Sequence, residues 1–320
     1  MQVKAPDRAA AEHRAPPRRP ADRPRTSAPR WRSRKIQGLG YAAPTALFVA
    51  VFFLLPLLLV GQMSLSDWPL LAGDKGGNAP ENYTDITDST LFWPAVRFTF
   101  LYTVIVTVVL LGLALLLALL VQESRPGAGF FRTVYFLPGA LGLASASLLF
   151  WGLYSPTTGP LSSILEKLGL VDDPVSFLGT PTSALLSTVF LVVWKFAGFY
   201  MLILLVGLQR IPHEVYEAAR MDGASRAQIF RSITLPLLRP SLALSLLLCV
   251  TGSLLAFDQF FVLTKGGPDN STVTVVQLIY REAFQRLNLG TAAALSILVL
   301  GALLLLNLLQ FRGLRRDDES

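Results

Sequence analysis

Long apolar runs alternate with short polar connections along most of the chain. Each run approaches the roughly 20 residues that an α-helix needs to cross a lipid bilayer. The segment Val106–Val121 lacks the polar stripe that a helix of a soluble bundle would carry. We therefore interpret six runs as membrane-spanning helices: Ala42–Ser64, Arg97–Val121, Thr133–Tyr154, Ser183–Leu208, Ser241–Leu263 and Gly290–Phe311. This pattern predicts an all-α, polytopic membrane protein.

The composition agrees with that class. Hydrophobic residues make up 52% of the 320 residues and charged residues only 15%, whereas about a quarter of the residues of a soluble domain are charged. We expect three parts: a basic N-terminal tail over residues 1–40, a six-helix membrane domain over residues 41–312, and a C-terminal tail over residues 313–320.

The distribution of Lys and Arg predicts the orientation in the membrane. Basic residues precede the first span and recur in alternate connections, and such residues favour the cytoplasmic side. Both termini are therefore expected in the cytoplasm. The net charge of +7 comes with a tail rich in Ala, Pro and Arg, which we interpret as a disordered, lipid-facing topology signal and not as a nucleic-acid-binding segment.

The sequence contains no evident machinery for catalysis. Cys249 stands alone, and His13 and His213 have no partners at metal-ligand spacing. The glycine-rich loop Thr264–Thr272 lacks the Gly-Lys-Ser/Thr ending of a phosphate-binding P-loop. We therefore expect no catalytic residue, no metal and no cofactor, and hence no enzyme.

A charged stretch, EAARMDGASRAQIFRSITLP, separates two of the apolar spans. Pro212 suits the first turn of a helix, and Glu214–Met221 follows a helical pattern. Gly223 interrupts the pattern, since glycine adopts the backbone angles of a sharp turn. Ser225 is suited to cap a second short helix before Pro236 and Pro240 lead into the next span.

The first of these short helices has the features of a docking element. Small residues at Ala218 and Ala219 allow another backbone to approach closely, while Glu217, Arg220 and Asp222 supply charged groups. The connection is too polar to cross the membrane. We expect it to dock into a partner on the cytoplasmic side.

The order Glu-Ala-Ala, Asp-Gly-Ala, Ile-Thr-Leu-Pro resembles the EAA loop of bacterial ABC importer permeases. The similarity extends along much of the chain after residue 40. It is clearest in WKFAGFYMLILLVGLQRIPHEVYEAARMDGA (Trp194–Ala224) and FDQFFVLTKGGPDNST (Phe257–Thr272), with weaker matches at Glu81–Ile86, Phe131–Leu141 and Trp151. These segments resemble carbohydrate permeases of the maltose-permease first-subunit type. Phe98 and Ser162 depart from the family pattern, which often has Asn at both places.

The resemblance implies a type I importer permease fold in the bacterial inner membrane. It implies that residues 209–240 carry the coupling helix that sits in a cleft of an ATP-hydrolysing subunit. The coupling residues carried over from the motif are Glu217, Ala218, Ala219, Asp222, Gly223 and Ala224. The implied partners are a second, homologous permease subunit, two copies of a cytoplasmic ATP-binding subunit, an extracytoplasmic solute-binding protein and membrane lipid, but no nucleic acid.

Polar residues inside the spans are candidates for the substrate path, because charged groups there cost about 2.5–3.5 kcal/mol on insertion scales. With aromatic faces for stacking, the candidates are Lys195, Phe199, Tyr200, Asp258 and Gln259. The alternative is that Lys195 and Asp258 form an ion pair that locks two helices together.

The expected function is ATP-driven import of a mono- or oligosaccharide by alternating access. A related polar solute such as glycerol-3-phosphate is the alternative within the family. A secondary sugar transporter is the alternative from another class, but it usually shows an internal repeat of broken helices, and we find no second copy of the charged stretch.

Overall fold

The computed structural model describes residues 41–122 and 127–318, so the predicted tail over residues 1–40 lies outside the described residues. The chain divides into two parts, Met1–Leu55 and Pro56–Ser320. In the first part, residues 41–55 are helical, include a π-helical turn η1 (Ala50–Leu54), and expose every side chain. An apolar helix exposed on all sides is suited to contact with lipid.

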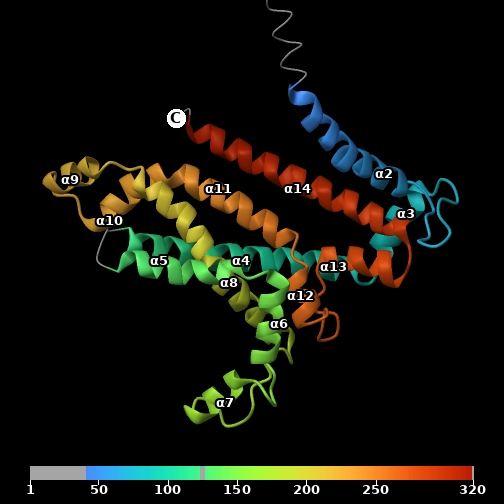
Figure 1. Ribbon diagram of the computed structural model, residues 1–320, viewed down its shortest axis with the longest axis horizontal. Coiled ribbons are helices and arrows are strands. Elements are labelled where there is room, and N and C mark those ends of the chain that lie inside the picture. Colours follow the sequence, from blue (N-terminus) through green and yellow to red (C-terminus); the bar gives the residue numbers. More distant parts are fainter. Residues whose placement is uncertain (1–40, 123–126, 319–320) are drawn as a thin grey trace, which may run out of the picture. The chain divides into compact units, whose positions relative to one another are not determined.

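Helices make up nearly all regular structure in the rest of the described chain (Figure 1). In order, they are α2 (Leu55–Met63), α3 (Ala79–Asp88), α4 (Phe92–Val121), α5 (Ala128–Phe136), η2 (Leu137–Ala140), α6 (Leu143–Leu153), α7 (Pro160–Lys167), α8 (Pro181–Gln209), α9 (His213–Met221), α10 (Arg226–Ile229), η3 (Phe230–Thr234), α11 (Leu235–Leu254), α12 (Asp258–Leu263), α13 (Val275–Tyr280), η4 (Arg281–Gln285) and α14 (Leu289–Asp318). The predicted all-α class is confirmed.

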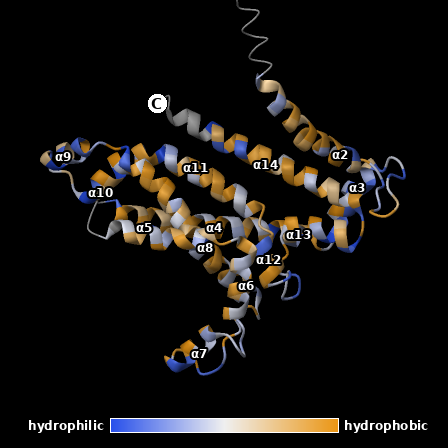
Figure 2. Cartoon of the chain, viewed as in Figure 1, coloured by the Kyte–Doolittle hydropathy of each residue, from blue (hydrophilic) through white to orange (hydrophobic). Residues whose placement is uncertain are grey.

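Five helices of the described chain are long and apolar enough to cross a membrane. They cover Tyr41–Met63, Phe92–Val121, Pro181–Gln209, Arg226–Leu263 and Leu289–Arg312. Their apolar character is visible along α4, α11 and α14 in Figure 2. Each corresponds to one predicted span. Since α14 runs to Asp318, residues 313–318 continue the last helix and do not form a separate tail.

The third predicted span, Thr133–Tyr154, is not one straight helix. Its place is taken by two helical pieces, Gly129–Ala140 and Leu143–Leu153, which meet at an angle of 94°. Pro138 lies in the last turn of the first piece, and Gly142 is extended with ψ 145°. Proline removes a backbone donor, and together with the extended glycine it ends the helix there. We call this bend the elbow.

The core of the second part lies between α4 and α8. Along α4, residues on one stripe are fully buried at intervals of four, including Val106, Leu110, Ala114 and Ala118. Small residues at such positions let two membrane helices approach closely. The elbow also packs tightly on α8, because a Cβ atom at Gly198 would lie 2.0 Å from the carbonyl oxygen of Tyr135.

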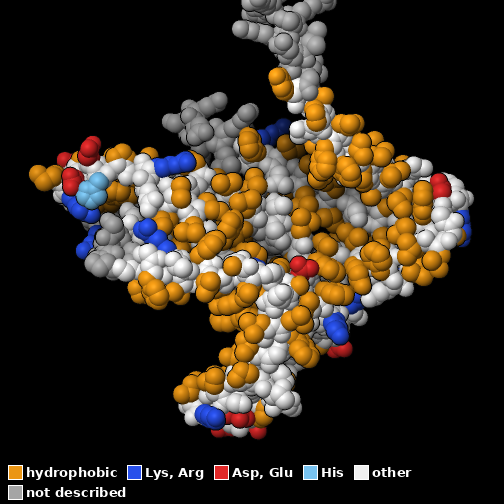
Figure 3. Space-filling model, viewed as in Figure 1, with side chains coloured by type: hydrophobic (Ala, Val, Ile, Leu, Met, Phe, Trp, Pro, Cys, Tyr) orange, Lys and Arg blue, Asp and Glu red, His pale blue; other side chains and the backbone are white. Residues whose placement is uncertain are grey.

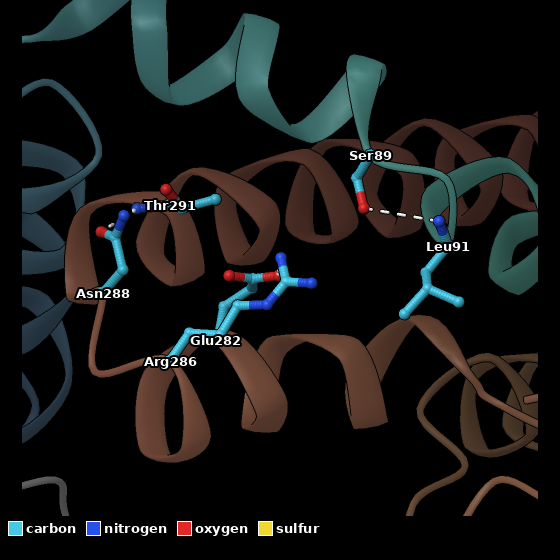
Figure 4. Close-up of polar contacts among 6 residues, drawn as sticks. All are labelled: Ser89, Leu91, Glu282, Arg286, Asn288 and Thr291. Carbon is cyan, nitrogen blue, oxygen red and sulfur yellow. Dashed lines mark hydrogen bonds and ion pairs between the residues drawn. The ribbon is translucent and has the colours of Figure 1, made fainter.

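Polar contacts order the segments that connect the spans at the end of the molecule opposite to α9. The Asn82 side chain, 1% exposed, donates to the carbonyl oxygens of Ser64 and Ser66 at 3.0 and 2.9 Å. Glu282 and Arg286 form an ion pair of 2.8 Å, and the Asn288 side chain caps α14 by accepting from the amide of Thr291 (Figure 4). The first contact fixes α3 against the end of α2, and the other two order η4 and the start of α14.

Candidate functional site

Helix α9 stands at the surface of the second part, with no buried residue. The sequence predicted Pro212 in the first turn of this helix. In the structure Pro212 is the N-cap, with extended backbone angles, and the helix begins at His213. Its apolar residues are also accessible: Val215 is 36% and Met221 87% exposed. Charged side chains gather around α9 and α10 in Figure 3. A helix that buries nothing in its own chain is available to a partner.

The end of α9 is fixed by a specific turn. The amide of Ala224 donates to the carbonyl of Ala219 at 3.0 Å, and the amide of Gly223 donates to the carbonyl of Arg220 at 3.1 Å. Together with the left-handed φ of +79° at Gly223, these bonds form a Schellman motif, which satisfies the last carbonyl groups of a helix. The predicted turn at Gly223 is confirmed.

Glu217 points away from the protein and pairs only locally. Its carboxylate lies 3.0 Å from Nδ1 of His213, one helical turn earlier, and both side chains are more than 60% exposed. Such an exposed pair contributes little to stability, at most about 1 kcal/mol. Glu217 therefore remains accessible to a group outside this chain.

The second short helix differs from the prediction. Ser225 caps it through a capping box with Gln228, as expected, but the helix does not end. It continues through the π-helical turn η3 into α11, with Pro236 near the start of α11 and Pro240 inside it. A π-helical turn changes the register of the backbone hydrogen bonds, so the helix can continue although proline has no backbone N–H to donate. The hydroxyl groups of Tyr216 and Thr234, 3.3 Å apart, join α9 to this helix.

A cavity of ≈ 380 Å³ lies among α4, α6, α8 and the break between α11 and α12. The polar side chains in its wall are Tyr102, Tyr200, Cys249, Ser253, Asp258 and Gln259. The break itself, at residues 255–257, brings backbone groups to the wall as well. Irregular backbone inside a membrane domain is tolerated where it lines a cavity.

Within this wall the side chains of Gln259 and Tyr102 form a hydrogen bond. The Gln259 side chain is 3% exposed and donates through Nε2 to the Tyr102 hydroxyl at 3.0 Å. Its Oε1 atom is buried and has no partner among the described residues. A buried acceptor without a donor is costly, so Gln259 is suited to accept a hydrogen bond from a ligand.

Lys195 does not pair with Asp258 in the described chain, so the alternative of an ion pair that locks two helices together is not what the structure shows. Its ammonium group donates to the carbonyl oxygens of Gly139, at 3.3 Å, and of Leu141. These carbonyls lie at the elbow, where the helix ends and lacks further amide donors. Lys195 is 4% exposed and does not line the cavity; it fastens the elbow to α8.

The two aromatic candidates for the substrate path, Phe199 and Tyr200, face in different directions. Tyr200 is 7% exposed and lines the cavity, whereas Phe199, 41% exposed, faces outward and touches Tyr200 edge-on. Of the candidate path residues, the structure therefore brings Tyr200, Asp258 and Gln259 together. Sequence reasoning missed Tyr102 and Ser253, because a single phenol or hydroxyl inside a long apolar run gives no periodic signal.

A second hollow of ≈ 680 Å³ adjoins the amino-terminal ends of α4 and α8. Its wall includes Trp93, Arg97 and Phe98. The Phe260 ring packs edge-on against both Phe98 and Tyr102, at centroid distances of 5.1 and 4.8 Å. Since Phe98 lines the hollow and Tyr102 the cavity, these three rings join the walls of the two spaces.

Comparison with known proteins assigns the chain to a family. Residues 92–312 match the model of the "Binding-protein-dependent transport system inner membrane component". The trehalose/maltose transport system permease protein MalF of Thermococcus litoralis is 36% identical over 85% of this chain and 91% of its own. The multiple sugar-binding transport system permease protein MsmF of Streptococcus mutans is 30% identical over 87% and 95%.

A solved structure shows the same fold. A chain of a bacterial ABC transporter involved in the import of the acidic polysaccharide alginate superposes with a TM-score of 0.79 at 25% identity, over 89% of this chain and 98% of that one. The relatives of the present chain are transport components and not enzymes. The protein, with its spans, its elbow and its exposed helix α9, belongs to the family of binding-protein-dependent transport system inner membrane components, the permeases of ABC importers.

Proposed function

We propose that the chain is the permease subunit of an ATP-driven importer that carries a sugar into the cytoplasm by alternating access. The observation that carries this proposal is the connection between two sites: an exposed helix α9, joined by Tyr216 to a helix that continues to the cavity wall. Relatives named for trehalose or maltose and for lactose support a sugar as substrate.

In this proposal α9 is the coupling helix and docks in a cleft of a cytoplasmic ATP-binding subunit. Ala218 and Ala219 allow close backbone approach, and Glu217 contacts the ATP-binding subunit. The Schellman turn at Gly223 fixes the direction in which the chain leaves the helix. Two such ATP-binding subunits serve this chain and a second, homologous permease subunit.

The sugar passes along the cavity wall formed by Tyr102, Tyr200, Asp258 and Gln259. Sugar hydroxyls lose hydrogen bonds to water when they enter the membrane, and these side chains replace them. Asp258 is exposed in the single chain, which fits a wall that the second permease subunit completes.

A solute-binding protein delivers the sugar at the end of the spans opposite to α9. The related alginate importer has been solved in complex with its periplasmic binding protein. The loops over residues 67–92 and 264–288 are the surfaces proposed for that contact here.

The test is to disrupt the coupling helix without disturbing the cavity. Within the described part of this chain a Cβ at Gly223 meets open space, so the obstacle to substitution there is the left-handed φ of +79°. Gly223→Val strains this turn, whereas Gly223→Asn tolerates it, since Asn adopts such angles far more readily. We expect Gly223→Val and Glu217→Lys to leave membrane levels near normal, to abolish uptake and to uncouple the ATPase, and Gly223→Asn to retain most uptake.

The readouts are membrane abundance, sugar uptake and ATPase activity of the complete transporter. Normal uptake by both Gly223→Val and Glu217→Lys contradicts the coupling role of α9. If Gly223→Val and Gly223→Asn lose sugar uptake to the same extent, the left-handed turn is not the reason that Gly223 is required.

A further inference from the structure

The cavity wall carries a negative charge that no neighbouring cation balances. Asp258 is the one acidic residue of this wall, and the described lining residues include no Lys, Arg or His. The described ion pairs do not include Asp258. Its carboxylate therefore faces the cavity without a counter-charge from the described part of this chain.

Two basic residues of the neighbouring helices, Lys195 and Arg97, do not supply a counter-charge in this wall. Lys195 adjoins the lining residue Phe196, but its ammonium group is directed to carbonyl oxygens at the elbow. Arg97 belongs to the wall of the second hollow, which adjoins the amino-terminal ends of α4 and α8. Neither side chain contributes to the wall of the cavity itself.

Uncharged groups in the wall add acceptors. Oε1 of Gln259 is buried without a partner in the described chain. At the helix break, the amide of Ala256 donates to the carbonyl of Ser253 and not to that of Gly252, so Gly252, which also lines the cavity, loses its regular helical donor. Acceptors without donors favour a ligand that presents hydroxyl hydrogens.

We propose that this cavity admits neutral sugars that donate hydroxyl hydrogen bonds, and that it disfavours anionic solutes such as uronic acids, sugar phosphates and glycerol-3-phosphate. The inference rests on the proposed function, because it concerns the same path. An anion beside Asp258 meets a like charge within the walls of a cavity, where repulsion is stronger than in bulk water. A hydroxyl-rich neutral ring pairs with Asp258, Gln259 and the Gly252 carbonyl.

The chain provides its own reporter for this charge. Cys249 is its single cysteine and lines the cavity. In membrane fragments that contain the complete transporter, Cys249 is treated with three thiol reagents of similar chemistry and different charge. They are the cationic trimethylammonioethyl, the anionic sulfonatoethyl and the neutral methyl methanethiosulfonate, and labelling of this chain is followed by mass spectrometry.

Each rate is divided by the rate of the same reagent with mercaptoethanol, so that intrinsic reactivity cancels. We expect the cationic reagent to label Cys249 faster than the anionic one by on the order of tenfold. In Asp258→Asn the ratio falls to within about twofold of unity. Cys249→Ala, which takes up no label, identifies the reacting residue.

The outcomes separate the inference from the proposed function. Equal rates for the two charged reagents in the wild type, or an unchanged ratio in Asp258→Asn, overturn the charge selection while leaving the path intact. Cys249 is 2% exposed in this conformation, so labelling requires the cavity to open during transport. If even the neutral reagent fails to label Cys249 in every state of the transport cycle, the cavity does not open to solutes, and the proposed sugar path fails together with the charge selection.

Discussion

At the scale of single residues, Lys195 has a structural role that its sequence position does not show. A charged side chain in a span suggests a substrate contact or an ion pair. Instead, Lys195 supplies the donors that the elbow lacks, at the carbonyls of Gly139 and Leu141. A helix interrupted inside a membrane must satisfy its backbone groups within the protein, and a long flexible ammonium side chain does this across two helices.

Replacing Lys195 tests that role. Lys195→Met leaves two buried carbonyl groups without their donor, which costs about 1–3 kcal/mol, so we expect lower thermal stability of the purified complex. Lys195→Arg keeps hydrogen-bond donors at this position, so we expect a smaller loss of thermal stability. Because Lys195 does not pair with Asp258, Lys195→Met is not expected to rescue Asp258→Ala; a rescue would show that the two charges interact after all.

The ion pair of Glu282 and Arg286 predicts a dependence on pH. Burial raises the pKa of Glu282, and the neighbouring Arg286 opposes that rise. A raised pKa means that ionised Glu282 is less stable in the folded protein, so the associated stability is present in acid and is lost as the pH rises through the folded-state pKa.

Arg286→Ala removes the opposing charge. We expect it to destabilise the segment at residues 275–288 by about 1–2 kcal/mol near pH 7.5, a value reduced because the Arg286 side chain is 58% exposed. The loss becomes smaller near pH 4.5, where Glu282 is protonated. Hydrogen exchange of this segment at the two pH values measures the effect, and Glu282→Gln combined with Arg286→Ala is expected to abolish its pH dependence.

At the scale of elements, the sequence predicted well what depends on local chemistry. The spans follow from apolar length, the turn at Gly223 from the conformational freedom of glycine, and the cap at Ser225 from its side chain. Five of the six predicted spans were found as single helices, and the turn and the cap were both found. These features are determined within a few residues of the chain, and so they can be read from it.

Three features were missed, two of them local and one between distant parts of the chain. Hydropathy cannot detect the 94° elbow, because both of its arms are apolar. Pro236 and Pro240 appeared to end a short helix, but the π-helical turn at Phe230–Thr234 carries the helix past them. The Tyr102–Gln259 contact joins residues that lie 157 positions apart, and a single sequence contains no signal for such a pair.

At the scale of the whole molecule, the orientation in the membrane remains a prediction from the basic clusters. Reporter fusions after Ser64 and after Tyr154 are expected outside the cytoplasm, and fusions after Val121 and after Leu208 inside it. The elbow makes the fusion after Tyr154 the most informative one, because it asks whether the bent pair α5–α6 crosses the membrane as one span. A cytoplasmic report there would leave five crossings and place the two termini on opposite sides.

The continuous helix from Arg226 to Leu254 has a mechanical consequence. At about 1.5 Å per residue it is a rod of roughly 40 Å. Tyr216 contacts it at Thr234, within its first third, and Ser253 near its other end lies in the cavity wall. Tilting such a rod by about 5° around one end moves the far end by roughly 3.5 Å, more than the length of a hydrogen bond. In the proposed transport cycle, a small rotation beside α9 is therefore enough to move the Ser253 hydroxyl into or out of hydrogen-bond distance of the sugar.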